Sequence, residues 1–500
     1  MLKNELTLYK RQYVLSTKEV TIFKNSSVTK VCDTHILTAE ASLTVTKKSD
    51  ETRNLILLGF LLDPHNPEYN NDKIVSDLLL KSNNFNEITL NTHSLGGKWI
   101  LIYYSDSEGL NIVNDIVGSR QVYFTQFENE TWAASQPHVL AQLCGKPLSN
   151  NPDIEDYVTS EQFKFTERAW IGDESRYQDV YHLLPNKYLN CTTARTIRFW
   201  PVNRIKKQTL EQVVPIISKS LQGILSSANN RFKLLLAVSA GWDSRVLLAA
   251  SKSVINDCYC FIQKFDSMTN SHPDIDIPSK LSKKLKFNFN IRDAKNYSGE
   301  FETALIKSVD IPQSENKRVL YYDFFSGFKD EVNISGVVGE LCRSRFGDKR
   351  EVSAKKLSAI FGRDDSTYAV QMTQKWLDEV KINNVEQTGV NIWDLFYWEQ
   401  FIGNWGVSGQ ASSDIAIEEF FPFNCRNIIE LSYGLDDLAY EDSPLFIALI
   451  NHMWPEALSE PVNPKSSFEK YITLCKNLLR KIGVFNKIRY IYFKLFRGTS

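Results

Sequence analysis

One stretch of the chain, residues 231–292, limits the possible folds more than any other. Short apolar runs, typical of strands buried on both faces, alternate there with segments whose apolar residues recur at a helical spacing. We expect strand, helix, strand, helix and strand at Lys233–Val238, Arg245–Val254, Cys258–Ile262, the segment marked by Ile277, Leu281 and Leu285, and Phe287–Ile291. Right-handed crossovers turn this β-α-β-α-β order into a doubly wound parallel sheet, so we predict a Rossmann-like α/β fold.

The remainder of the chain changes character near residues 201–208. Before that point, short apolar runs such as Leu55–Leu62 and Trp99–Tyr104 are separated by Asp, Asn, Ser and Gly at hairpin-like spacing. After it, the apolar residues of Thr209–Leu225 follow a helical period, and helical patterns dominate beyond residue 300. We therefore predict a β-rich sandwich domain over 1–200 and an α/β domain over 205–500 whose C-terminal part is helical.

Composition and charge exclude several classes of protein. Lys plus Arg total 58 and Asp plus Glu total 59, so the net charge of −1 provides no broad positive field for nucleic acid. The longest apolar runs fall short of the ~20 residues that span a bilayer, and the N-terminus lacks the apolar segment of a secretion signal. Eight scattered cysteines favour reduced thiols over a zinc site. We expect a cytoplasmic protein without nucleic-acid partners or integral membrane association.

The turn after the first strand of the 231–292 stretch carries the chemistry. It reads Ser239-Ala-Gly-Trp-Asp-Ser244 and opens a helix, so backbone N–H groups and the positive end of the helix dipole converge on one point. Ser239 and Ser244 add hydroxyl donors, and Gly241 allows close approach of a phosphate. Asp243 is unusual in an anion site unless it holds a divalent cation that bridges to the phosphates. On these residues alone, a simple helix cap made by Asp243 or Ser244 is an equal alternative.

The residues of this turn resemble the asparagine synthetase family, which includes β-lactam synthetase and the lasso-peptide cyclases. Residues 236–244 are similar to that family's S-G-G-x-D-S pyrophosphate loop. Three more segments match in the same order, so that the resemblance covers roughly 205–475: Asn333–Glu340, similar to S-G-x-G-x-D-E; Glu419–Arg426, similar to R-x-P-F-L-D; and Pro461–Lys465, similar to the loop that delivers a catalytic lysine. The resemblance implies an ATP-pyrophosphatase domain.

That family activates a carboxylate by attack on the α-phosphate of ATP, releases pyrophosphate, and lets an amine displace AMP. The resemblance implies that the residues at the family's matching positions bind ATP, namely Ala237, Ser239, Gly241, Asp243, Ser244, Ile262, Ser335 and Gly336. It further implies that Asp243 and Glu340 ligate Mg²⁺, that Glu340 can take the proton of the attacking amine, and that Lys465 stabilises charge on the phosphoryl oxygens. The alternatives are a helix cap for Glu340, a solvated lysine for Lys465, and core positions that act only through their backbone for Ala237 and Ile262.

Two positions depart from the family pattern. Ala240 replaces the first glycine of the loop, which would cost ~1 kcal/mol if that position has a positive φ. Residues 337–340 carry one acidic residue, Glu340, where the pattern has an Asp-Glu pair. Arg343 and Arg345 follow closely, either as replacements for lost phosphate or carboxylate contacts or as surface charges.

The first 200 residues resemble the glutaminase domain of the same family. The matching segments are Leu58–Asp63, Leu95–Tyr104, Asn114–Arg120, Ala133–His138 and His182–Lys187. A glutaminase of this type uses a cysteine at the chain's N-terminus, whose α-amino group is the general base. Here Met1 is followed by Leu2, and the first cysteine is the internal Cys32. We therefore expect a degenerate glutaminase-like domain that does not hydrolyse glutamine.

Together these features predict a ligase that adenylates a carboxylate with Mg-ATP and forms an amide with ammonia or a substrate amine. Asparagine is the family's default product. A tailoring amide synthetase or cyclase acting on a peptide or sugar acid is the second reading, and a nucleotide-binding protein without catalysis is the third. A homodimer is compatible with all three. The basic segment Lys470–Arg497 is either a terminal helix packed on the second domain or an amphipathic helix on an anionic membrane.

Overall fold

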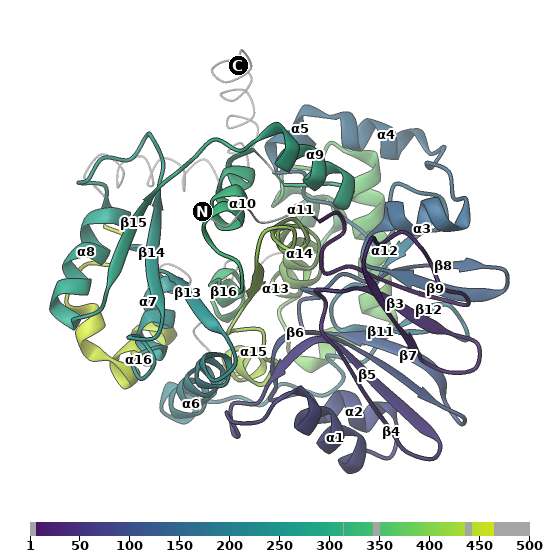
Figure 1. Ribbon diagram of the computed structural model, residues 1–500, viewed down its shortest axis with the longest axis horizontal. Coiled ribbons are helices and arrows are strands. Elements are labelled where there is room, and N and C mark those ends of the chain that lie inside the picture. The colour runs from purple at the N-terminus through teal and green to yellow at the C-terminus, as the bar shows by residue number, and fades with distance from the viewer. Residues whose placement is uncertain (1–6, 314, 344–350, 436–442, 465–500) are drawn as a thin grey trace.

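The computed structural model describes residues 7–313, 315–343, 351–435 and 443–464 and shows a mixed α/β protein (Figure 1). Two antiparallel six-stranded sheets come first along the chain, and a parallel five-stranded sheet follows. Lys465, Arg345 and the segment Lys470–Arg497 lie outside the described residues. Within the described part, none of the helices combines the length and the hydrophobicity that crossing a bilayer needs.

The two antiparallel sheets stack face to face. The strands of one, in spatial order, are β10 (Tyr181–His182), β8 (Tyr123–Phe127), β9 (Glu130–Ala134), β1 (Tyr13–Ser16), β3 (Ile36–Glu40) and β2 (Ser26–Lys30). Those of the other are β12 (Arg195–Arg198), β11 (Lys187–Asn190), β7 (Gly109–Asn114), β6 (Gly96–Ser105), β5 (Arg53–Leu62) and β4 (Val45–Ser49). This confirms the β-rich character predicted for the first 200 residues.

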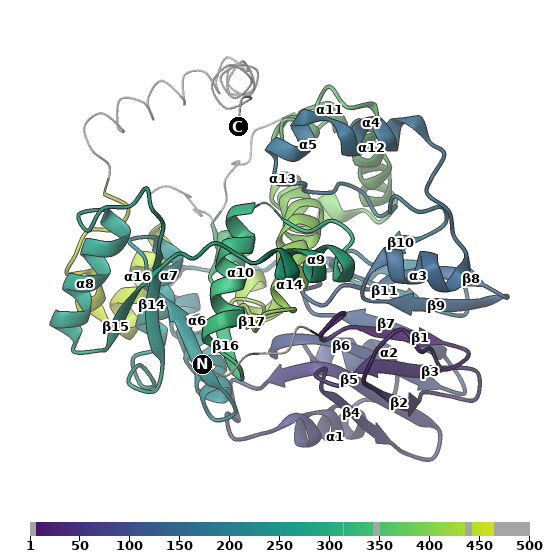
Figure 2. The ribbon, with the colours of Figure 1, turned by 45° about the horizontal axis from the view of Figure 1, so that its top comes forward.

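Helices cover the outer faces of both sheets, so the first part of the chain has four layers (Figure 2). Residues of α1 (Asn71–Lys81) and α2 (Phe85–Asn91) pack on the sheet of β5, and α3 (Pro137–Cys144) packs on the sheet of β1. The sequence of strand β5 is almost continuously apolar because both faces of the strand are buried. Ile56 and Leu58 face the other sheet, whereas Leu55 and Leu57 face α1. These helices were not predicted.

The third sheet is parallel, with the order β15-β14-β13-β16-β17. Its strands are β13 (Lys233–Ala237), β14 (Tyr259–Lys264), β15 (Phe289–Asp293), β16 (Glu331–Ile334) and β17 (Glu418–Phe420). One face packs against α6 (Leu210–Asn229), α7 (Trp242–Ala250) and α8 (Pro273–Leu285), and the other against α9 (Gly299–Ser308) and α10 (Glu315–Gly327). The predicted β-α-β-α-β order and the α/β fold are therefore confirmed.

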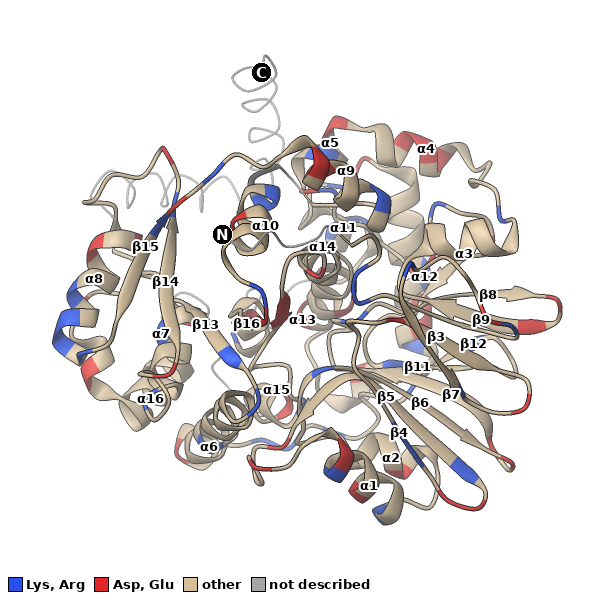
Figure 3. Ribbon diagram, in the orientation of Figure 1, with Lys and Arg blue, Asp and Glu red and all other residues tan. Residues whose placement is uncertain are grey.

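Helices make up most of the chain between β16 and the end of the described part, as predicted for the region beyond residue 300. They are the 3₁₀-helix η1 (Val337–Cys342), α11 (Ala354–Ala359), α12 (Thr367–Ile382), the 3₁₀-helix η2 (Val385–Thr388), α13 (Ile392–Phe396), the π-helix η3 (Tyr397–Gly406), α14 (Val407–Ser413), α15 (Arg426–Tyr433), α16 (Pro444–Met453) and the 3₁₀-helix η4 (Pro455–Leu458). Two short helices of the first half, α4 (Pro152–Thr159) and α5 (Glu161–Phe165), pack beside α12 and α11 (Figure 2). Both signs of charge are interspersed over the ribbon (Figure 3).

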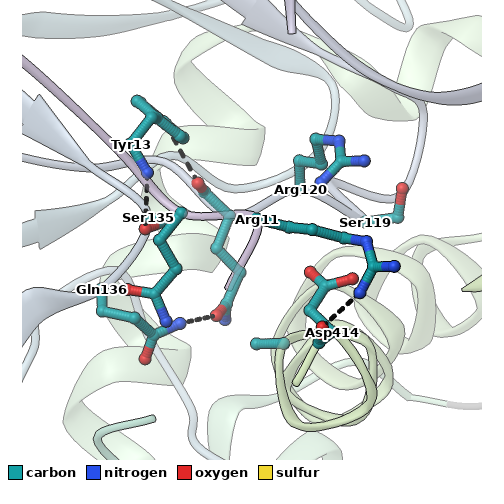
Figure 4. Close-up of a pocket in the computed structure, with 10 residues that line it drawn as sticks. Arg11, Tyr13, Ser119, Arg120, Ser135, Gln136 and Asp414 are labelled. Atoms are coloured by element: carbon teal, nitrogen blue, oxygen red, sulfur yellow. Dashed lines mark hydrogen bonds between the residues drawn. The ribbon is translucent and has the colours of Figure 1, made fainter. Parts of the chain in front are cut away.

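A buried cluster of charges joins the two halves of the chain. Lys98 of β6 is fully buried, and its Nζ lies 2.6 Å from Asp414 Oδ1 and 3.2 Å from Glu418 Oε1. Arg120 Nη2 lies 2.8 Å from Glu418 Oε2, and Arg11 reaches across a pocket to the Asp414 carbonyl (Figure 4). Burial alone would raise the pKa of Glu418, but the three cations outweigh it and hold the pKa well below its usual range. The domain division at residues 201–208 stays a prediction.

Candidate nucleotide-binding site

The predicted anion loop lies where the strand order of the parallel sheet reverses. From β13 the chain moves outward through β14 to β15, and it then returns to place β16 on the other side of β13. Leu236 of β13 is paired with Ile334 of β16, so residues 238–241 and the residues after Ile334 leave neighbouring carboxyl ends of the sheet. Crevices at such reversal points are where open α/β sheets bind their ligands.

The loop is held together by its own hydroxyl groups. Ser239 N–H donates to Ser244 Oγ at 3.1 Å, Gly241 N–H donates to Ser239 Oγ at 3.1 Å, and the two hydroxyl oxygens are 2.9 Å apart. Ala240 is outside the set of residues with positive φ, and its methyl group is buried in the hydrophobic core. Alanine in place of the first loop glycine therefore introduces no backbone strain, and the departure from the pattern at this position costs little.

A carboxylate already occupies one donor of the loop. Ala240 N–H donates to Asp274 Oδ1 at 2.9 Å, and Asp274 belongs to the first turn of α8. Backbone N–H groups at a helix N-terminus favour negative charge. The oxygen of Asp274 thus shows that an anionic oxygen fits beside the loop.

Asp243 is half-buried and pairs with Arg343. Arg343 Nη2 lies 2.9 Å from Asp243 Oδ1 and 2.8 Å from Oδ2, so one nitrogen bridges both carboxylate oxygens. Burial raises the pKa of Asp243 to about 6, because the attraction of Arg343 only partly offsets the desolvation and the nearby Glu340 adds repulsion. Of the two predicted alternatives for Arg343, a carboxylate contact is the one observed.

Glu340 lies in η1 on the same side of the site. Its Oε2 accepts a hydrogen bond from the hydroxyl of Tyr397, the first residue of the π-helix η3. Glu340 is near enough to Asp243 to raise the pKa of that carboxyl. The structure thus brings together Ser239, Gly241, Asp243, Ser244, Gly336 and Glu340 of the predicted site. Ser335 directly precedes Gly336, and its N–H donates to the Phe420 carbonyl at 3.0 Å.

Magnesium prefers octahedral oxygen ligands, and the side chains found here do not offer them. Both oxygens of Asp243 are engaged by Arg343, and one oxygen of Glu340 accepts from Tyr397. Among the residues that the structure describes, no group of three or more His, Cys, Asp or Glu is arranged to hold a metal ion. As they stand, these residues do not fit a magnesium ion, and their role as its ligands stays a prediction.

Hydrogen bonds hold the segment that leads to Lys465 beside the anion loop. Asn463 N–H donates to the Ala240 carbonyl at 2.9 Å. Arg245 is fully buried, and its guanidinium donates to the carbonyls of Ala457, Glu460 and Pro461 at 2.7, 3.0 and 3.1 Å. The described chain therefore ends, at Pro464, one residue after a direct contact with the anion loop.

Ala237 and Ile262 lie on adjacent strands but one row apart. Ala237 is paired with Phe261, so the next residue, Ile262, points to the opposite face of the sheet. Their side chains cannot line one pocket together, which leaves the backbone role predicted for them. Gln263, in contrast, points to the same face of the sheet as Phe261. Its side chain is 6% exposed, and neither its amide nitrogen nor its amide oxygen has a hydrogen-bond partner within the described structure.

Four residues of the site, Arg245, Gln263, Asp274 and Tyr397, escaped prediction from the sequence. Arg245 directly follows the loop motif, and Asp274 follows a His-Pro pair that starts a helix, so proximity and helix-start signals were present for these two. Gln263 and Tyr397 carry no local signal.

Comparison with known proteins gives little beyond this geometry. No protein-family model matches the chain, and no curated protein matches it. Among solved structures, the chain is similar to glutamine phosphoribosylpyrophosphate (PRPP) amidotransferase from B. subtilis, complexed with ADP and GMP, with 10% sequence identity and a TM-score of 0.24. The match covers 67% of this chain and 71% of that one. So distant a likeness carries no argument about fold or function.

Proposed function

We propose that the chain is an ATP-dependent carbon–nitrogen ligase of the asparagine synthetase type, which activates a carboxylate as its adenylate and converts it to an amide. The observation that carries the proposal is the position of residues 238–244. This loop stands at the reversal point of a parallel sheet, at the start of α7, and already binds one carboxylate oxygen. A pyrophosphate group would replace the Asp274 oxygen at Ala240 N–H and take further hydrogen bonds from Ser239, Gly241 and Ser244.

The reaction balances without covalent participation of the protein. A carboxylate oxygen of the substrate attacks the α-phosphorus of ATP, the bond to the bridging oxygen breaks, and pyrophosphate leaves with that oxygen. Ammonia or an amine then attacks the acyl carbon, and AMP leaves with the carboxyl oxygen it received. In this proposal Glu340 takes the proton of the attacking nitrogen, and Lys465 stabilises the charge on the phosphoryl oxygens.

The nitrogen would come from outside the chain. The first strand of the described residues, β1, starts at the buried Tyr13, whose hydroxyl donates to the Gln121 carbonyl. Just before it, Gln12 donates to the Ser308 carbonyl in the second half of the chain at 2.6 Å. Cys32 lies in the turn between β2 and β3, next to Thr34 and away from the start of β1. As an internal residue, Cys32 has no free α-amino group to act as a general base, and in this proposal the first domain hydrolyses no glutamine.

Gln263 is the residue best suited to read the base of the nucleotide. A buried carboxamide without a partner is costly, and a glutamine side chain can pair with both the amino group and the ring nitrogen at the N6/N7 edge of adenine. Gln263 lies near the carboxyl end of β14, the neighbour of β13 in the sheet. We therefore place adenine at this end of the sheet, and ATP rather than GTP as the nucleotide.

The test is pyrophosphate release from ATP across a panel of carboxylates, with ammonia and with primary amines. The panel includes aspartate, short peptides with free carboxylates and sugar acids, because the predicted product classes differ in the carboxylate. Release that requires one carboxylate class, together with the matching amide found by mass spectrometry, supports the ligase.

A second candidate is a protein that binds the nucleotide without turning it over, which the Asp243–Arg343 ion pair favours. It would bind ATP but release no pyrophosphate with any carboxylate or amine in the panel. That result would reject the ligase and retain the nucleotide site.

A further inference from the structure

The position of Arg343 gives the anion loop a built-in cation. Its Nη2 bridges the two oxygens of Asp243 at 2.9 and 2.8 Å, and its side chain is 5% exposed. The guanidinium carbon also lies 4.8 Å from the ring centre of Phe446, a fully buried residue of α16. An ion pair and an aromatic face therefore fix this arginine in the interior, unlike a surface side chain that is free to turn away.

The loop after β16 is packed so closely on Asp243 that it leaves no room for a second carboxylate there. A Cβ atom on Gly336 would lie 2.8 Å from the Cβ of Asp243, and one on Gly339 would lie 2.7 Å from Asp243 Oδ1 and 3.1 Å from the Phe423 ring. Gly339 immediately precedes Glu340, so neither glycine position of this loop can carry a carboxylate without displacing Asp243. A larger residue at 339 would displace the carboxylate that now holds Arg343.

A divalent cation would have to compete with this arrangement. To ligate Asp243 it must compete with a guanidinium that is 5% exposed and contacts both carboxylate oxygens, and displacing the guanidinium would take the carboxylate away from a buried charge, which is unfavourable. Arginine, in turn, is well suited to phosphate recognition, because its planar fork can form two parallel hydrogen bonds to phosphate oxygens. The same position thus already contains the positive charge that a metal would bring.

We propose that Arg343 replaces the divalent cation of this site, so that the loop binds diphosphate and triphosphate groups without magnesium, with Asp243 as the residue that positions Arg343. This inference rests on the proposed nucleotide site and goes beyond it, because it assigns the role of the metal to a side chain. It also reassigns Asp243 from metal ligand to positioning residue.

The experiment is calorimetric titration of the full chain with inorganic pyrophosphate and with α,β-methylene-ATP, in EDTA and in excess MgCl₂. We expect the wild-type affinities in the two buffers to agree within about threefold. Arg343→Gln should lose at least tenfold in EDTA, and MgCl₂ should restore most of that loss, since Asp243 is then open to a metal. Arg343→Lys, which keeps the charge, should retain binding in EDTA within about tenfold.

Magnesium alone provides a readout that a purely structural arginine would not change. Titration with MgCl₂ in the absence of phosphate should show no binding to the wild type and binding to Arg343→Gln. Thermal unfolding of each variant, and of an Arg231→Gln control at a half-buried arginine of the same domain region, identifies losses that come from misfolding.

The possible failures are distinguishable. Wild-type binding that appears only with MgCl₂ would overturn the role of Arg343 and leave the nucleotide site intact. Unchanged binding of Arg343→Gln in EDTA would do the same. Absence of binding in both buffers would overturn the nucleotide site, and this inference with it.

Discussion

Replacement of Arg245 by methionine should release the segment that leads to Lys465. The guanidinium donates three hydrogen bonds to carbonyls of residues 457–461 and makes no ion pair within hydrogen-bonding distance in the described structure. Burial lowers the pKa of Arg245 to about 10, so the side chain is charged at neutral pH. Methionine fills a similar volume without these donors.

The expected magnitude follows from these three bonds. A hydrogen bond to a charged group contributes about 1.5–3 kcal/mol, but the released carbonyls regain water when the segment opens. We therefore expect a net loss of about 2–3 kcal/mol in the free energy of local opening, which is roughly a 30- to 150-fold loss of amide protection. The reporter is the amide of Asn463, which donates to Ala240 at 2.9 Å and whose φ of 45° is unfavourable without an anchor.

Hydrogen exchange measured by mass spectrometry on peptides covering residues 455–464 gives this protection. Arg231→Met is the matched control, because burial also lowers the pKa of Arg231 to about 10 and its guanidinium donates to the Leu61 carbonyl and to Asn71, in the first half of the chain. Both variants should lose global stability, and only Arg245→Met should lose protection at residues 455–464. Equal exchange of this segment in the two variants would refute the anchoring role of Arg245.

Three further predictions concern chemistry. If the chain is a ligase, Lys465→Ala should slow pyrophosphate release by ~10²–10³ and leave ATP affinity within a few-fold, and Lys465→Arg should restore little of the rate. Stopped-flow assays measure the rate of pyrophosphate release, and titration measures the affinity for ATP. The protein should form no glutamate from glutamine, with or without ATP, and a glutaminase activity that disappears in Cys32→Ala would contradict the proposed first domain. Burial raises the pKa of the Cys32 thiol, but hydrogen bonds with His35 and Thr34 outweigh it and lower the pKa to about 7, whereas burial raises that of Cys144 to about 11. The thiolate of Cys32 therefore forms as pH rises through about 7, and its alkylation by iodoacetamide should increase over about pH 6–8, ahead of Cys144; a profile unchanged by His35→Gln would show that the imidazole has no part in it.

The central part of the fold was predictable from the apolar runs of its inner strands. Strand β13 has three consecutive buried leucines, Leu234–Leu236, and Cys260 and Phe261 of β14 are also buried, so both strands read as apolar runs that end in small or polar residues. Strand β15 lies at the edge of the sheet and none of its residues is buried, so its prediction rested on the alternation of strand and helix patterns along the chain. The helices α1 and α2 were missed because they have 11 and 7 residues and begin after Asn70 and Asn84. Asparagine caps a helix and also forms turns, so these caps read as part of the loops between strands.

The sequence predicted only those residues of the site that belong to short motifs. The loop and its two serines come from one short segment, and the structure brings Gly336 and Glu340 beside it, as their order implied. The partners that decide the chemistry are distant in sequence: Asp243 pairs with a residue 100 positions away, and Glu340 with one 57 positions away. Such pairings depend on how helices pack, which no local pattern encodes.

The π-helix η3 has a consequence for any attempt to separate the two halves of the chain. Trp398 Nε1 donates to the Ile116 carbonyl at 2.7 Å, Gln400 Oε1 accepts from Gly172 N–H at 2.8 Å, and Asn404 Oδ1 lies 3.1 Å from His182 Nδ1. The same helix presents Tyr397 to Glu340. In a fragment that starts at residue 205, these polar groups would lose their hydrogen-bond partners. Each group that stays buried would then destabilise the fragment by about 1–3 kcal/mol. The first half thus supplies hydrogen-bond partners on which the packing of the second half depends, so we expect a fragment that begins at residue 205 to be less stable than the same residues in the whole chain.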